Sequence, residues 1–453
     1  MDKKKFHFVG VGGIGMSGIA LILLKMGYKV SGSELEPNAL TEKLELLGAK
    51  VYKGHKASNI AGDVDVVVYS SSIAKDNPEY AEALKRKLPV AHRAKILGEL
   101  VNTKKGIAVS GTHGKTTTTS LISVMLERSG LDPTAIIGGE IELFKSNAKY
   151  GNGPYVVAEA DESDGSFVNL KPLYSVITNV EMEHMDYYRS IKDMIAAYRS
   201  FANNTKAGGA VFYNFADENA KKALKGFKGR VESFGLSREA AIYPLGIMME
   251  GFCTSYTCVY KGHALGKVEL SIPGRHNVLN SLVTVLIGLN LGIEFGQIVK
   301  SIKDFRGTKR RFQLRAESDG VMLIDDYAHH PTEIRAVLDA CRGWKDKRII
   351  VVFQPHRYSR TLHLAEEFGK CFSGADKLIL TDIYPASEKP IKGVSVHTIY
   401  ERVKKSGLLD IVVMEKEMIA EYVMGLKQPG DMILVMGAGN IKKVADDLAA
   451  RLS

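Results

Sequence analysis

The stretch VSGTHGKTTT, residues 109–118, joins the end of an apolar run to a glycine turn, a lysine and a series of threonines. The usual phosphate loop has a glycine five residues before its Gly-Lys pair, and here that position is Val109. Gly111 and Gly114 can still curl the backbone so that N–H groups face an anion at the start of the next helix. Lys115 would then reach the β and γ phosphates, and Thr116 or Thr117 would hold magnesium. The alternative is a turn that only caps the helix, so the rest of the chain has to decide.

Length and composition describe an ordinary globular protein of several domains. The 453 residues are too many for one hydrophobic core and predict about three domains, with 45% hydrophobic and 25% charged residues. The net charge of +10 is scattered, without a basic stripe among aromatic residues, so we expect no nucleic-acid partner. The four cysteines lack CxxC spacing, and Cys253 and Cys258 should point to opposite faces of a strand. We therefore expect a reducing compartment and no structural zinc.

The N-terminal residues resemble a secretion signal, because three lysines precede an apolar region. Glycines break that region, no small-residue cleavage site follows, and its longest aliphatic piece, IALILL, is far shorter than a membrane span. We expect a cytoplasmic protein without a membrane partner.

Short apolar runs alternate with amphipathic stretches along the chain, which predicts an α/β fold with parallel strands buried on both faces. The runs are FHFVGVG, YKVSGSE, VDVVVYSSS, GIAVSGT, YVVAEADES, YSVITNV, GVMLIDDY, RIIVVFQP, KLILTDIY and DMILVMGAG. The stretch from about 230 to 272 alternates instead like antiparallel hairpin strands. Polar, basic stretches at 101–106 and 304–311 mark two boundaries. The sequence thus predicts three α/β domains in series, 1–105, 106–306 and 307–453.

The first domain begins with GVGGIGMSG after a strand, so Gly10, Gly12 and Gly15 satisfy the pattern GxGxxG, and Glu34 ends the next strand. This is a good dinucleotide fingerprint, and an NAD-dependent oxidoreductase is one interpretation. The glycines predict only that a phosphate lies near a helix N-terminus, however, and a UDP-sugar would use the same geometry.

The middle domain places acidic residues at the ends of two strands. YVVAEADESDGSF carries Glu159, Asp161, Glu162 and Asp164, and VITNVEMEHMD carries Glu181, Glu183, His184 and Asp186. Either motif alone is more typical of a solvated acidic loop. Beside the phosphate loop, on neighbouring parallel strands, they predict a magnesium site with one imidazole ligand.

Two further motifs leave alternatives open. In PGRHNVLNSL, Asn277 and Asn280 lie one helical turn apart and can either pair with an adenine edge or cap the helix. In the third domain, the Asp325, Asp326, His329 and His330 cluster can be read as a metal site, although such loops are common without one. Arg357 and Arg360, one turn apart after a strand, suit a carboxylate or phosphate clamp.

Seven ordered motifs resemble the ATP-dependent Mur ligases of bacterial cell-wall synthesis over essentially the whole chain: GTHGKTTT, EADESD, TNVEMEHMD, GRHNVLNS, GTKRRF, DDYAHHPTE and QPHRYSRT. The resemblance implies three domains: a Rossmann-like UDP-binding domain, a P-loop ATPase-like central domain with a small antiparallel β element, and a Rossmann-like C-terminal domain that binds the amino acid. It implies that ATP phosphorylates the lactyl carboxylate of UDP-N-acetylmuramate and that L-alanine attacks the acyl phosphate, in peptidoglycan precursor synthesis. ATP, two magnesium ions and a monomer or weak homodimer are expected.

The resemblance also implies roles for individual residues. Expected catalytic residues are Lys115, Glu159, His184, Arg311 and Asp326, with Thr116, Glu159 and His184 as magnesium ligands. Expected ATP contacts are Gly111, Thr112, His113, Gly114, Lys115, Thr116, Thr117, Asn277, Asn280 and Arg311. Expected UDP-sugar contacts are Gly12, Gly13, Ile14, Gly15, Ser33, Glu34, Ser71 and Ser72. For the alanine we expect Tyr327, His329, Arg357 and Arg360, since a free amino acid needs its carboxylate neutralised.

Two departures from the family pattern and one rival activity remain. Sister ligases carry a carbamylated lysine where this chain has Tyr198, and Glu34 stands where aspartate is usual. The alanine-adding members also lack that lysine, so Tyr198 favours alanine. The rival is a ligase that attaches a whole recycled tripeptide to the same sugar nucleotide, but QPHRYSRT resembles the single-amino-acid enzyme.

Overall fold

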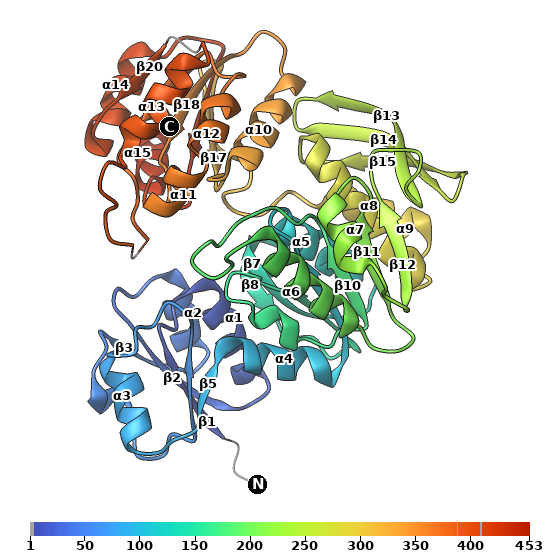
Figure 1. The fold of residues 1–453 in the computed structure, drawn as a ribbon, viewed down its shortest axis with the longest axis vertical. Coiled ribbons are helices and arrows are strands. Elements are labelled where there is room, and N and C mark those ends of the chain that lie inside the picture. Colours follow the sequence, from blue (N-terminus) through green and yellow to red (C-terminus); the bar gives the residue numbers. More distant parts are fainter. Residues whose placement is uncertain (1–3, 387, 408–409) are drawn as a thin grey trace. The chain divides into compact units, whose positions relative to one another are not determined.

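The computed structural model describes residues 4–386, 388–407 and 410–453. Its contacts divide the chain into two compact units. The first contains the residues up to 245 with 257–267 and 279–304, and the second contains 246–256, 268–278 and 305–453. Three β-sheets with covering helices make up these units (Figure 1).

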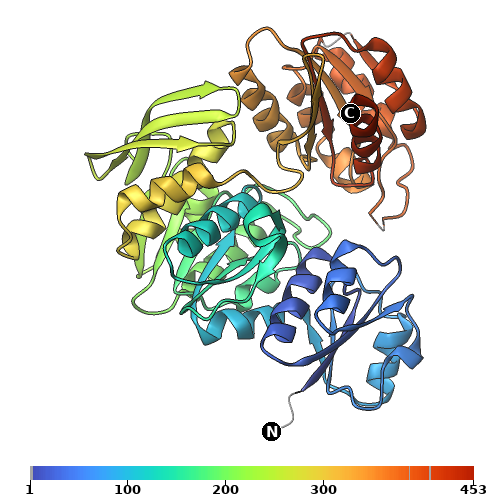
Figure 2. The ribbon, with the colours of Figure 1, turned by 180° about the vertical axis from the view of Figure 1, so that it is seen from behind.

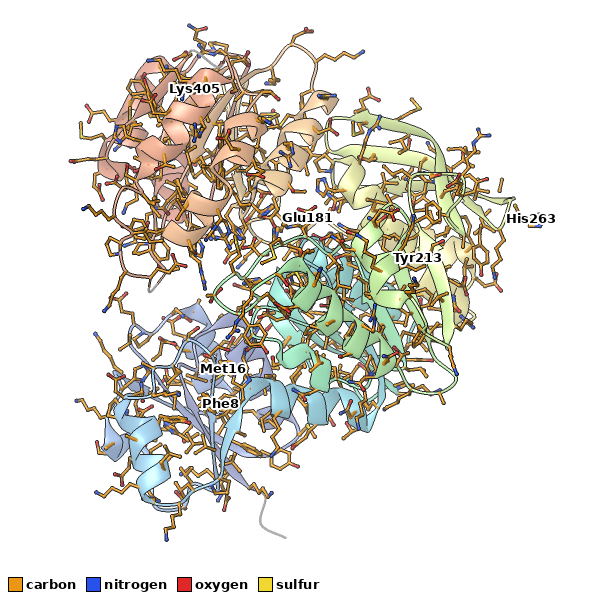
Figure 3. All side chains as sticks on the ribbon, viewed as in Figure 1. Phe8, Met16, Glu181, Tyr213, His263 and Lys405 are labelled. Atoms are coloured by element: carbon orange, nitrogen blue, oxygen red, sulfur yellow. The ribbon has the colours of Figure 1, made fainter. Side chains whose placement is uncertain are left out.

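The first sheet has the order β3-β2-β1-β4-β5, and its strand pairs are parallel. Its strands are β1 (Lys5–Val9), β2 (Lys29–Glu34), β3 (Lys50–Lys53), β4 (Val66–Tyr69) and β5 (Val90–His92), and the helices are α1 (Ile14–Lys25), α2 (Ala39–Leu46), η1 (Ala57–Asn59), α3 (Pro78–Lys85) and α4 (Arg93–Thr103). Phe8 and Met16, labelled in Figure 3, belong to the core cluster on one face, whereas Val9 and Ala83 pack on the other. The chain order reverses between β1 and β4, and such a switch point is where open α/β sheets bind ligands.

The second sheet has the order β15-β14-β13-β12-β11-β10-β6-β9-β7-β8. Its strands are β6 (Lys105–Ser110), β7 (Thr134–Ile141), β8 (Ser146–Lys149), β9 (Tyr155–Glu159), β10 (Tyr174–Ile177), β11 (Ala210–Asn214), β12 (Arg230–Phe234), β13 (Ile242–Glu250), β14 (Cys253–Tyr260) and β15 (His263–Leu270). Its helices are α5 (Lys115–Arg128), η2 (Glu142–Phe144), η3 (Ser166–Asn169), α6 (Ile191–Asn203), α7 (Glu218–Leu224), α8 (Arg275–Asn290) and α9 (Phe295–Asp304). The view from behind in Figure 2 shows the face of this domain that carries α5. Strand β6, which leads into the phosphate loop, lies between β9 and β10.

The third sheet lies in the second unit and has the order β16-β17-β21-β18-β19-β20. Its strands are β16 (Gln313–Ser318), β17 (Val321–Asp326), β18 (Arg348–Phe353), β19 (Lys377–Leu380), β20 (Ile411–Val413) and β21 (Asp431–Met436). Its helices are α10 (Pro331–Ala340), η4 (Cys341–Gly343), α11 (Tyr358–His363), α12 (Ala365–Cys371), α13 (Val396–Lys405), η5 (Lys416–Met418), α14 (Ile419–Leu426) and α15 (Lys442–Leu452). Helices α10, α12 and α13 pack on one face of this sheet, and α14 and α15 pack on the other.

The predicted α/β architecture is confirmed, and each of the ten apolar runs contains a strand. One expectation was too broad, because β12, inside the stretch assigned to antiparallel strands, pairs parallel with β11. Strands β14 and β15 are sheet neighbours joined by two residues, which only a hairpin allows. Cys253 is exposed and Cys258 is buried, as predicted for opposite strand faces. Within the described ranges, every helix is too short or too polar to cross a membrane.

Candidate active site

The phosphate loop connects β6 to α5 through two glycines with positive φ. Gly111 has φ 141°, and a Cβ atom there would lie 1.8 Å from Thr178 Oγ1, so this position has no room for a side chain. Gly114 has φ 82° and precedes the first residue of α5. Among the described residues, no side chain caps this helix, so the first-turn N–H groups keep the capacity to bind an anion.

The residues that follow β10 hold the loop in shape. The N–H of Thr112 donates to the Asn179 carbonyl at 3.1 Å, and the N–H of His113 donates to Asn179 Oδ1 at 2.8 Å. The His113 ring lies 3.4 Å from the carboxylate of Glu181, which is labelled in Figure 3. These two loop N–H groups serve the protein itself, so a phosphate would rely on the start of α5.

Lys115 is the cation of this loop, and its side chain is only 13% exposed. Its Nζ donates to the carbonyls of Gly111 at 2.5 Å and Thr112 at 3.2 Å, and to the Glu162 carboxylate at 2.9 Å. Burial disfavours the ammonium, but the negative charges of Glu162, Asp161 and Glu159 raise the pKa of Lys115 above its ordinary value. The lysine is therefore charged at neutral pH.

Thr116 and Glu159 bring two hard oxygen atoms together. The Thr116 hydroxyl donates to Glu159 Oε2 at 2.9 Å, and the N–H of Gly138 donates to the same oxygen at 2.9 Å. A hydroxyl and a carboxylate at this spacing suit a hard cation such as magnesium. Thr117 is partly exposed on the first turn of α5.

His184 lies on the other side of the phosphate loop, after β10. Its backbone has φ 53°, which is uncommon for a residue with a side chain, and its Nε2 lies 3.7 Å from Glu162 Oε1. The sequence prediction placed the two acidic motifs on neighbouring strands. The structure instead places them on the two strands that flank β6, so both motifs adjoin the phosphate loop from opposite sides.

The two asparagines of α8 make different contacts. Asn280 Oδ1 accepts a hydrogen bond from Thr118 Oγ1 at 3.0 Å, and a Cβ atom at Gly114 would lie 2.9 Å from it. Asn277 lies in the first turn of the helix, and its Nδ2 donates to the Pro273 carbonyl at 2.7 Å. Asn280 therefore adjoins the phosphate loop directly.

In the first domain, the carboxylate of Glu34 binds the backbone of the glycine loop. The N–H of Gly12 donates to Glu34 Oε2 at 2.8 Å, and a Cβ atom at Gly12 would lie 2.8 Å from that oxygen. Gly13 is the N-cap of α1 and provides no side-chain cap, so the start of α1, with Ile14 and Gly15, can receive an anion.

Arg93 supplies a cation to this loop from another part of the chain. A Cβ atom at Gly15 would lie 3.0 Å from Arg93 Nη1, and Arg93 Nη2 lies 2.6 Å from the Asp161 carboxylate. Although burial opposes ionisation, the Arg93 and Lys115 charges hold the pKa of Asp161 below its ordinary value. Arg93 thus links the glycine loop to the loop that follows Glu159.

A second link joins the same two regions. The exposed Ser71 donates a short hydrogen bond to Asp164 and lies 3.1 Å from the His92 ring, and its neighbour Ser72 is also exposed. Ser33, in contrast, is fully buried and donates to the Glu79 carboxylate at 2.5 Å. Its hydroxyl therefore supports the end of β2 from inside the domain, next to Glu34.

In the second unit, Asp326 ends β17 and is 5% exposed. It accepts hydrogen bonds from the N–H groups of Phe312 at 2.6 Å and Ala328 at 2.7 Å. Burial raises its pKa to about 6, although the Arg311 charge and the two N–H donors lower it. Arg311 lies over the Tyr327 ring at 5.2 Å from its centroid and 3.8 Å from Glu333. The predicted catalytic pair of this domain is thus brought together.

Two of the residues predicted to bind the alanine substrate, Tyr327 and His329, continue into a row of aromatic rings, and Arg360 lies next to that row. Successive ring centroids from Tyr327 to His329, His356 and Tyr384 are 5.5, 5.6 and 5.6 Å apart. Arg360 is 4% exposed, and its Nη1 donates to the His356 carbonyl at 2.8 Å. Arg357 has φ 71° and lies 3.6 Å from Glu388, so the two arginines have different surroundings.

The sequence analysis did not identify Arg93, His356 or Tyr384. It also did not predict that Glu162 pairs with Lys115. Arg93 follows the short strand β5, and Tyr384 follows β19, so both stand beyond the carboxyl ends of parallel strands. That position is the signal that could have found them, because ligands bind at this edge of a parallel sheet.

Comparisons with known proteins agree on one family. Three family models match in order: Mur ligase family, catalytic domain (residues 5–105), Mur ligase middle domain (109–288) and Mur ligase, glutamate ligase domain (310–439). UDP-N-acetylmuramate--L-alanine ligase of Geotalea uraniireducens is 46% identical over 99% of this chain and 98% of its own. The enzyme of the same name from Pelotomaculum thermopropionicum is 48% identical over 100% and 98%.

Solved structures point the same way. UDP-N-acetylmuramate-alanine ligase of Thermotoga maritima superimposes with a TM-score of 0.85 at 29% identity, over 99% of this chain and 98% of that one. A murein peptide ligase of Psychrobacter arcticus shares the fold, with a TM-score of 0.74 at 22% identity over 99% and 98%. The predicted family is confirmed, and the oxidoreductase interpretation of the first glycine loop is not. The chain belongs to the Mur ligase family.

Proposed function

We propose that this protein uses ATP to join L-alanine to the lactyl carboxylate of UDP-N-acetylmuramate. The observation that carries the proposal is the partly buried, charged Lys115 beside an uncapped helix N-terminus and the Thr116–Glu159 oxygen pair. The full-length relatives that carry this activity in their names support the choice of substrates.

The chemistry needs ATP because a carboxylate is a poor electrophile. A carboxylate oxygen attacks the γ-phosphorus, the bond between that phosphorus and the β–γ bridging oxygen breaks, and ADP leaves. The alanine amine then attacks the acyl carbon, the C–O bond to phosphate breaks, and the amine gives up a proton. Positioning and charge neutralisation supply most of such catalysis.

The middle domain, residues 106–306, would hold ATP. The N–H groups at the start of α5 and Lys115 would bind its phosphates, and Asn280 adjoins the loop at Gly114. Thr116 and Glu159 would hold one magnesium ion, which would neutralise phosphate charge. His184, beside Glu162, would belong to a second magnesium site.

The outer domains, residues 1–105 and 307–453, would bind the two substrates that are joined. The start of α1, with Arg93 beside Gly15, would receive the UDP diphosphate, and Ser71 and Ser72 would face the sugar side. In the third domain, Tyr327, His329, Arg357 and Arg360 would bind alanine. Arg311 and Asp326 would act on the reacting groups from that domain.

The test is ADP release by the purified protein with UDP-N-acetylmuramate and one amine at a time. We expect turnover with L-alanine and weak turnover with glycine, because loss of one methyl group costs only about 1–3 kcal/mol. A preference for a tripeptide over alanine would replace the substrate assignment. NAD reduction without ADP release would contradict the proposal altogether.

A further inference from the structure

Glu162 has a carboxylate that no solvent reaches, with a side chain 0% exposed. Its own carbonyl accepts hydrogen bonds from Tyr188 Oη at 2.7 Å and from the N–H of Gly165 at 2.9 Å, so its backbone is fixed. Burying a carboxylate is costly unless a cation compensates it. Lys115 Nζ, at 2.9 Å, is that cation.

The donors of Lys115 are fully used within the protein. An ammonium has three N–H donors, and Lys115 contacts three acceptors, which are the carbonyls of Gly111 and Thr112 and the carboxylate of Glu162. A bound γ-phosphate would therefore have to replace one of them. The carboxylate is the only one of the three that is anionic, as the phosphate is, so replacing it leaves the charge balance around the ammonium nearly unchanged.

We propose that Glu162 is a positioning residue that occupies the place of the γ-phosphate at Lys115 until ATP binds. The inference rests on the proposed function, in which Lys115 binds the γ-phosphate. It assigns Glu162 a role different from that of Glu159, whose carboxylate meets Thr116 and Gly138. The His184 ring lies beside the same carboxylate, with its Nε2 3.7 Å from Glu162 Oε1.

The direction of one affinity change tests the proposal. In Glu162→Gln the competing negative charge is lost while the amide keeps an acceptor oxygen. We expect the Kd of a non-hydrolysable ATP analogue, measured by calorimetry, to fall about tenfold, because a charge-assisted hydrogen bond no longer has to be given up. A residue that only supports the loop would give an unchanged or weaker affinity, and either result would overturn the proposal.

Asp161→Asn is the matched control. Asp161 acts on Lys115 through its charge, but the carboxylate that bonds to the ammonium is that of Glu162. We expect the Kd of the Asn variant to change by less than about threefold, since the Asp161 carboxylate bonds to Arg93 and makes no hydrogen bond that Lys115 must give up. If the Kd fell equally in both variants, the loss of any nearby negative charge would explain the change. The proposal that the phosphate replaces Glu162 at Lys115 would then be overturned.

Thermal unfolding provides a second readout. Without nucleotide, Glu162→Gln should unfold at a lower temperature than the wild type, and the analogue should raise its melting temperature more than it raises that of the wild type. An equal rise would overturn the proposal. Should the Gln variant not fold, Glu162→Asp keeps the charge but draws it back by one methylene, and we expect a smaller tightening in the same direction.

Lys115→Ala separates this inference from the function on which it rests. If Lys115→Ala binds the analogue as the wild type does, the phosphate-loop assignment itself fails. If Lys115→Ala binds it weakly while Glu162→Gln does not bind it more tightly, only the role of Glu162 fails.

Discussion

Two glycine loops in this chain each follow a parallel strand and open a helix, residues 10–13 before α1 and residues 111–114 before α5. No side chain of the described residues caps either helix, so both starts can bind an anion. They differ in where the compensating cation comes from. The second loop carries Lys115 in its own sequence, whereas Arg93 reaches the first loop from the start of α4.

The difference shows why the cation of one loop can be recognised from the sequence and the cation of the other cannot. A lysine and threonines directly after a glycine turn predict phosphate and magnesium at once. In the first loop the N–H of Gly12 donates to the carboxylate of Glu34, which ends the next strand. Read locally, that acid favours a ribose and an oxidoreductase. Arg93, far away in sequence, places a positive charge beside Gly15, and only the structure shows it.

The largest effect should come from removing the local cation. We expect Lys115→Ala to lower kcat by about a thousandfold, because the phosphate loses its charge-assisted donor in the transition state. The variant should also lose about 3–5 kcal/mol of stability, since Glu162 remains buried without its cation. ADP release and thermal unfolding measure the two effects.

The double variant Lys115→Ala with Glu162→Gln separates them. It should recover most of the stability while ADP release stays as low as in Lys115→Ala. Recovery of activity along with stability would mean that the lysine acts only on folding, and the comparison of the two loops would lose its basis.

Removing the cation of the first loop should have a smaller and more selective effect. We expect Arg93→Ala to raise the KM for UDP-N-acetylmuramate about 10- to 100-fold, the value of one or two charge-assisted hydrogen bonds. The KM for ATP should change by less than about threefold. Lys95→Ala, an exposed lysine on the same helix, is the control and should leave all constants unchanged. An equal rise for ATP would mean that Arg93 acts through Asp161 instead.

The third domain tests whether an arginine outside both loops affects only the amine substrate. In Arg360→Lys the charge remains and the planar fork is lost, so we expect the KM for alanine to rise about tenfold and the other two KM values to stay within about twofold. Arg402→Lys, in a partly exposed pair with Glu366, is the control. A larger rise for ATP than for alanine would move Arg360 to the phosphate side.

The last effect concerns pH and the stability of the third domain. Burial raises the pKa of Asp326 from its ordinary value of 3.8 to about 6, so between these values the native state binds a proton that the unfolded state releases. Stability should therefore fall as pH rises from about 4 to about 6, by at most about 3 kcal/mol.

Asp326→Asn should lack this fall, so the stability difference between wild type and variant should shift in favour of the variant as pH rises. Trp344 provides the signal, since it is the one tryptophan of the chain and stacks on Phe312, whose N–H donates to Asp326. Parallel pH curves for the two proteins would contradict the raised pKa.

The apolar runs and the motif order determined much of this protein. Continuous Val and Ile runs predict parallel strands wherever they occur, because a strand buried on both faces has no polar alternation. Motifs with their chemistry in adjacent residues, such as Gly111 to Thr117, could be read for the same local reason. The point where the sheet changes from parallel to antiparallel strands was harder to predict. Strand β12 pairs parallel with β11, although the strands that follow it in the chain alternate like hairpin strands.

The sequence by itself determined the family, the three α/β domains and the glycine loops, because these follow from local patterns of burial and backbone freedom. Only the tertiary structure decided which charges meet. Arg93 reaches Gly15 and Asp161, Glu162 holds Lys115, and Arg360 stands behind His356. The physical reason is that Coulomb energy and desolvation depend on distance and burial, and residues far apart in sequence acquire both only when parallel strands bring their carboxyl ends to one edge.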